Sequence, residues 1–99
     1  MIKKGNVMKK NDVVSVVTSV GEFIGKFVSD SESGVTLEDP RMIVHNQQGM
    51  GFAKGVSMAG VEEPKQVTFH AGQVVTVLEV NPAVEKAWRE FTSGLVLAK

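Results

Sequence analysis

The chain has 99 residues and a mass of 10.7 kDa, a length that accommodates one small domain and no second hydrophobic core. Its 42% hydrophobic content excludes a disordered tail, and its 11 basic and 11 acidic residues leave no global field for holding a polyanion. The absence of cysteine excludes disulfides, thiolate zinc sites and cysteine nucleophiles. With no apolar stretch that could span a bilayer and no secretory signal pattern, we expect a soluble, cytoplasmic protein without membrane contact.

The first residues, 1–12, are interpreted as a basic, partly mobile arm. They show no sustained hydrophobic periodicity and contain four lysines, Lys3, Lys4, Lys9 and Lys10. Two roles stay open for these lysines: attraction of an RNA backbone, or a solubilising tail.

The first two predicted strands follow directly. Residues 13–20 (VVSVVTSV) are mostly β-branched, and branched side chains lose rotamer freedom in a helix, so this run predicts a strand. Residues 22–29 (EFIGKFVS) predict a second strand. Gly25 inside it indicates a bend, a bulge or a close backbone approach.

A turn at residues 30–34, bounded by Asp30 and Gly34, predicts the end of the second strand. Residues 35–39 then alternate in polarity, as expected for a half-buried strand. Pro40 interrupts this strand, and residues 42–45 are expected to continue it beyond a kink.

The second half of the β region begins with residues 47–64, which hold four glycines and predict a variable loop or a flexible hairpin. Residues 66–70 alternate in polarity, and residues 73–80 form the longest strand-like run. The two are separated by Ala71 and Gly72, so the pattern predicts that they pair as a hairpin.

The last element has clear helix boundary signals. Asn81 is suited to cap the amino end, Pro82 takes the first helical position and Gly94 is placed to end the helix. The spacing puts four apolar side chains on one face, Val84, Ala87, Trp88 and Phe91.

Together the elements predict an all-β fold, a small and strongly bent five-stranded barrel over residues 13–80, followed by a C-terminal α-helix and tail over residues 81–99. The valine-rich strands offer apolar side chains on both faces, and one helix covers only part of the second face. We therefore expect a homo-oligomer. The alternative is a monomer that tolerates scattered exposed valines.

Two segments resemble the signatures of Sm-like proteins, the fold family of Sm, LSm and Hfq proteins, and in particular its divergent branch from marine cyanophages and ocean metagenomes. The first is FIGKFVSDSESGVTLED, residues 23–39, which follows the family's pattern of a glycine, an Asp, a turn, an apolar pair and another Asp at Gly25, Asp30, Val35, Leu37 and Asp39. Gly34 stands where the family usually has Asn.

The second segment is FHAGQVVTV, residues 69–77, which is similar to the family's later signature of an apolar residue, Arg, Gly and a β-branched strand. Gly72 takes the glycine position, and Ala71 stands where the family has Arg. The Arg and the Asn are the groups that ordinarily hold a base in the family's uridine pocket.

The resemblance implies an RNA-binding ring of five to seven copies of the chain. In such a ring residues 66–70 of one copy pair with residues 73–80 of its neighbour, and RNA contacts the loops at residues 30–34 and 70–73.

His70 and Gln73 are the candidate RNA-contacting side chains within those loops. An imidazole can stack on a base and an amide can bond to a base edge. The competing interpretation of His70 is a solvated turn histidine.

Enzymatic chemistry has no support in the sequence. We find no nucleophile paired with a base, no phosphate-binding loop and no metal-ligand spacing, and we expect no cofactor. Residues 11–40 hold six acids and one base, which opposes phosphate binding there. The second functional hypothesis is therefore an architectural or protein-interaction ring of a phage with no nucleic-acid ligand.

Overall fold

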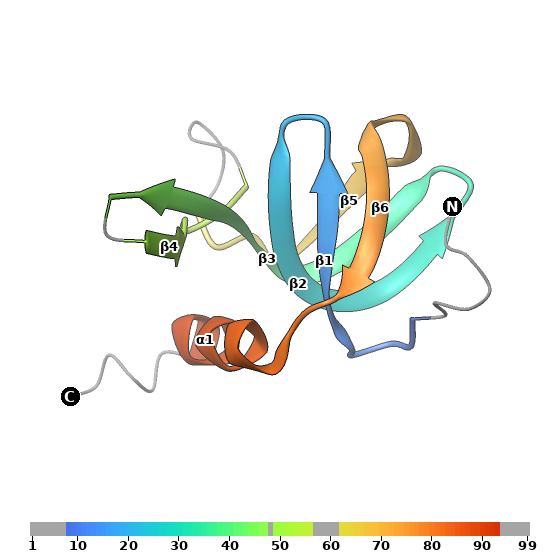
Figure 1. Cartoon of the computed structure of the whole chain (residues 1–99). Coiled ribbons are helices and arrows are strands. Elements are labelled where there is room, and N and C mark those ends of the chain that lie inside the picture. Colours follow the sequence, from blue (N-terminus) through green and yellow to red (C-terminus); the bar gives the residue numbers. More distant parts are fainter. Residues whose placement is uncertain (1–7, 48, 57–61, 94–99) are drawn as a thin grey trace.

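The computed structural model of the chain describes residues 8–47, 49–56 and 62–93 (Figure 1). In chain order the elements are β1 (Val13–Thr18), β2 (Gly21–Ser31), β3 (Gly34–Asn46), β4 (Gly49–Phe52), β5 (Gln66–His70), the 3-10 turn η2 (Ala71–Gln73), β6 (Val74–Glu79) and α1 (Pro82–Ser93). The coarser part of the predicted fold, an antiparallel β sheet followed by one C-terminal helix, is confirmed, but the sheet has six strands and not the five predicted.

The strands form an antiparallel sheet in the order β4-β3-β2-β1-β6, and β5 also pairs with β3. β5 lies along the first part of β3, from Gly34 to Glu38, while β4 lies along its last part, from Ile43 to Asn46. β5 and β6 follow each other in the chain but pair with β3 and β1 respectively. The hairpin predicted between these two strands is therefore wrong.

Both faces of the sheet bury apolar side chains, as the valine-rich strands predict. One cluster of buried residues comprises Met8, Val14, Val16, Phe27, Val35, Leu37 and Val77. The other comprises Val13, Ile24 and Trp88, with Ile43, Phe52, Val80 and Val84 packed against it. Since successive side chains of a strand point to opposite faces, β1 contributes to both clusters. α1 covers the second cluster through Trp88.

The helix begins and packs as its boundary signals predict. The Asn81 side chain accepts a hydrogen bond from the Val84 amide at 2.9 Å, which satisfies one of the unpaired donors of the first turn. Trp88 is only 2% exposed, and its indole Nε1 donates to the Asp39 carbonyl at 3.1 Å. α1 is thus fixed to the middle of β3. Gly94, predicted to end the helix, lies outside the described residues.

Two of the predicted irregularities in the strands are present. A Cβ on Gly25 would lie 3.1 Å from the Glu38 carbonyl and from Leu37, so this glycine permits a close approach of β2 and β3. The β2–β3 register shifts beside it, where β3 contains one extra residue. Asp39 at this bulge has a φ of 52°, and Pro40 is buried. β3 continues beyond Pro40, as predicted.

Residues 8–12 differ from the mobile arm predicted for residues 1–12. Met8 is buried in the first cluster. The Asn11 amide donates to the Phe27 carbonyl at 2.8 Å, and the Phe27 amide donates to the Asp12 carbonyl at 2.7 Å. This segment therefore packs against β2. Residues 1–7 lie outside the described part of the chain.

The predicted loop at residues 47–64 contains the short strand β4, which forms a hairpin with the end of β3. Four residues of β4 are too few, and too rich in glycine, to give a strand signal in the sequence. In Figure 1 this hairpin projects from the sheet on the same side as α1.

Candidate nucleic-acid interface

η2 connects β5 to β6 and contacts the turns at both ends of β2. The Ala71 amide donates to the Ser33 carbonyl at 3.0 Å, in the turn that follows β2. Ser19 lies in the turn that precedes β2, and its amide donates to the Gln73 carbonyl at 3.2 Å. η2 is thus held in place by backbone hydrogen bonds, and His70 and Gln73 stand at its two ends with exposed side chains.

Gln73 is oriented by a neighbouring hydroxyl. The Ser19 Oγ donates to the Gln73 Oε1 at 2.6 Å. This bond occupies the amide oxygen, and among the described residues no contact involves the Nε2 group, which can donate to solvent. Gln73 can therefore present two donors to a ligand. Ser19 is a site residue that the sequence analysis missed, since nothing in the local pattern connects residues 54 positions apart.

His70 is positioned by its partner strand. Its backbone pairs with Gly34, which has a φ of 155°. A Cβ on Gly34 would lie 2.2 Å from the Phe69 carbonyl oxygen, so only glycine fits at this crossing. Gly34, predicted as a turn residue, is thus the first residue of β3 and permits the close approach of β5. Gly72, also predicted as a structural turn residue, has open space around its Cβ position and no positive φ, so the fold does not require glycine there.

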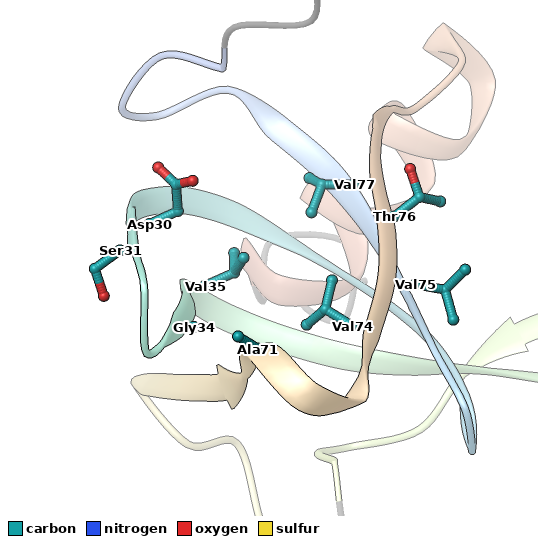
Figure 2. Close-up of a pocket in the computed structure, with 9 residues that line it drawn as sticks. All are labelled: Asp30, Ser31, Gly34, Val35, Ala71, Val74, Val75, Thr76 and Val77. Atoms are coloured by element: carbon teal, nitrogen blue, oxygen red, sulfur yellow. The ribbon is translucent and has the colours of Figure 1, made fainter. Parts of the chain in front are cut away.

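A small cavity lies behind η2, between the β2–β3 turn and β6 (Figure 2). Its lining is mainly aliphatic, and Asp30, Ser31 and Thr76 are its polar side chains. The volume is about 30 Å³, which is room for about one or two water molecules. The cavity is too small for a nucleobase. Any base that contacts this end of the molecule must lie on its surface, beside His70 and Gln73.

The predicted basic residues do not gather at η2. Lys9 and Lys10 are exposed and precede β1, whereas Ser19 and Gln73 lie beyond its other end. Near η2 the exposed acids are Asp30, which is still part of β2, and Glu32, in the β2–β3 turn; the turn predicted over residues 30–34 is thus confined to Glu32 and Ser33. The structure thus brings His70 and Gln73 to one turn and leaves Lys9 and Lys10 elsewhere. Lys3 and Lys4 lie outside the described residues.

Arg41 is a buried cation that the sequence analysis did not single out. Only 4% of this residue is exposed, and one of its terminal nitrogens, Nη1, donates to the Pro40 carbonyl at 3.2 Å. Its Nε has no acceptor among the described residues. The guanidinium carbon lies 5.8 Å from the centre of the Phe91 ring, so Arg41 packs between β3 and α1 as a structural group.

Within the described residues, no three His, Asp or Glu side chains gather as metal ligands, and no helix is long and apolar enough to cross a membrane. No protein-family model matches the chain, and a search of curated proteins finds no match.

Proposed function

We propose that the chain is an Sm-like protein that assembles into a homo-oligomeric ring of five to seven copies and binds single-stranded RNA without catalysing a reaction. The observation that carries this proposal is the connection between β5 and β6. β5 and β6 are joined by three residues but do not pair with each other; β5 pairs with β3, and β6 pairs with β1.

The contacts of η2 favour a strongly bent, barrel-like sheet. β2 has 11 residues and would span about 36 Å if fully extended. The step from His70 to Val74 reaches at most about 15 Å, yet η2 is hydrogen-bonded to the turns at both ends of β2. Bending of β2, together with the β2–β3 bulges, accounts for these contacts.

The edge strands support assembly. β5 and β6 each pair on one side only among the described strands, and an unpaired strand edge is a template for another chain. β6 also leaves Val75 and Leu78 partly exposed, at 69% and 47%. Pairing of β5 from one copy with β6 from the next would satisfy both edges and, if the rotation closes, gives a ring.

RNA binding rests on repetition of η2 around such a ring. Each copy would contribute an exposed imidazole from His70 and the free amide donors of Gln73. These groups can stack on bases and bond to base edges. Ala71 supplies no guanidinium, so we expect binding weaker than that of a ring with Arg at this position.

The test is fluorescence anisotropy with labelled uridine-rich and adenine-rich oligomers at two salt concentrations. We expect binding that weakens as salt rises, because released counterions contribute to affinity. His70→Ala should weaken binding about 5- to 100-fold, which corresponds to the loss of one stacked base. His45→Ala is the matched control, since His45 is also exposed but lies in the β3–β4 hairpin.

The alternative function, an architectural or protein-interaction ring without RNA, is favoured by one observation. The exposed acids Asp30 and Glu32 lie near η2, and Lys9 and Lys10 do not. An assembled ring that binds neither oligomer at low salt would support this alternative and contradict RNA binding.

A further inference from the structure

An apolar groove lies between β4 and α1. Its volume is about 650 Å³, and its lining includes Met50 and Phe52 from β4 and Ala87 and Phe91 from α1. The rings of Phe52 and Phe91 lie 5.6 Å apart and pack against each other. Met50 is nevertheless 44% exposed and Phe91 40% exposed. Two large apolar side chains thus remain partly in water at one groove.

An apolar segment follows this groove directly in the sequence. α1 ends at Ser93, two residues beyond Phe91. Residues 94–99 read GLVLAK and lie outside the described part of the chain. Leu95, Val96 and Leu97 are three consecutive aliphatic residues. Contact between them and the groove would remove apolar surface of both from water.

The distance is compatible with contact inside one chain. Four residues beyond Ser93 reach at most about 14 Å, while the stretch of α1 from Ala87 to Ser93 spans about 9 Å. A glycine directly after a helix permits the chain to reverse direction, and residue 94 is glycine. Leu97 can therefore return to the groove wall formed by α1 and face β4.

We propose that residues 95–97 pack into the β4–α1 groove of their own chain and cover Met50 and Phe91. Charge at the groove agrees with this occupant. Glu63 and Glu90 line the groove with a single cation, Lys54, while residues 95–97 carry no charge and are followed by Lys99. The proposal is independent of RNA binding and of ring formation.

The chain has no cysteine, so a pair of introduced cysteines gives a clean test. In the full-length variant Met50→Cys/Leu97→Cys, mild oxidation should form a disulfide, because contact in the groove brings the two residues within bonding distance. The matched control is Val44→Cys/Leu97→Cys. Val44 is exposed on the same hairpin but pairs with Gly51, whereas Met50 pairs with His45, so Val44 and Met50 point to opposite faces.

We expect the first pair to close about tenfold or more faster than the control, since contact raises the effective concentration of one thiol at the other. Equal rates for the two pairs would overturn the proposal. Mixing unlabelled and ¹⁵N-labelled protein before oxidation identifies the source of the segment by mass spectrometry. Linked peptides of a single label support packing within one chain, and peptides of mixed label would show that a second copy fills the groove.

A second variant tests the contact without cysteine chemistry. Leu97→Asp should lower the thermal midpoint by several degrees, because a carboxylate is costly in an apolar groove. Lys99→Asp, two residues further on, should have a smaller effect. Equal midpoints for Leu97→Asp and the parent chain would contradict the proposal.

Discussion

Gly34 is the residue whose backbone is most constrained. It begins β3, pairs with His70 and approaches the Phe69 carbonyl so closely that a Cβ would lie 2.2 Å from the oxygen. Its φ of 155° is also one that side-chain-bearing residues rarely adopt. The position of His70 at the end of β5 thus depends on the absence of a side chain at Gly34.

Gly34→Ala should lower the free energy of unfolding by about 2–4 kcal/mol, because β5 must move away from β3 or the backbone must take up strain. Urea unfolding followed by Trp88 fluorescence measures this loss. Gly72→Ala is the control, expected to change stability by less than about 1 kcal/mol, since its Cβ meets open space. Equal losses for the two variants would contradict the assigned role of Gly34.

Arg41 is buried without an acidic partner among the described residues. Burial of an unpaired cation is costly, and replacement by an apolar side chain of similar length removes that cost while keeping the packing. Arg41→Met should therefore leave the free energy of unfolding within about 1 kcal/mol of the parent or raise it. Arg41→Ala should destabilise the chain, because it removes the contact with Phe91. Chemical denaturation of both variants checks this order, and a large loss for Met would contradict it.

At the scale of the elements, α1 packs on the sheet through one buried side chain, Trp88. Trp88 fills the second cluster and bonds to the Asp39 carbonyl at the β3 bulge, so it joins the helix to the sheet at the irregular point of the strand. Phe91 lies one turn further along and is partly exposed.

Trp88→Ala should cost about 3–5 kcal/mol, the range for a buried aromatic residue. Phe91→Ala should cost less, because part of its ring is already in water. Thermal unfolding monitored by circular dichroism compares the two variants. A larger loss for Phe91 than for Trp88 would show that the helix is held through the groove instead of the cluster.

Local sequence signals predict most elements but not their partners. A β-branched run identifies β1, and the Asn-Pro boundary identifies α1, because these signals act over a few residues. The pairing of β5 and β6 was predicted incorrectly because a short link between two strands usually indicates a hairpin. Here the backbone hydrogen bonds of η2 to Ser19 and Ser33, both distant in sequence, separate the two strands.

The candidate site was predictable to the same extent. The turn position of His70 and Gln73 follows from the local pattern, and the structure places both at the ends of η2. The bond between Ser19 and Gln73 and the burial of Arg41 depend on contacts across the sheet. No local pattern in the sequence predicts the Ser19–Gln73 bond or the burial of Arg41.

At the scale of the whole molecule, β5 and β6 each have one edge whose backbone groups pair with no other described strand. Val75 lies at the bulge where the β1–β6 register shifts, and Leu78 follows it on the same edge strand. Lysine on an edge strand opposes pairing with another chain. The variant Val75→Lys/Leu78→Lys should therefore shift the protein to monomers, as measured by analytical ultracentrifugation. Val44→Lys, in the β3–β4 hairpin, should leave the association unchanged, and a parent-like mass for the double variant would place the contact elsewhere.

The mass of the protein in solution tests the central proposal most directly. Gel filtration coupled to light scattering, at micromolar concentration of the full chain, should give a single species of five to seven times 10.7 kDa. A homogeneous monomer under these conditions would contradict assembly through the free edges of β5 and β6, and with it the repeated η2 surface on which the proposed RNA binding depends.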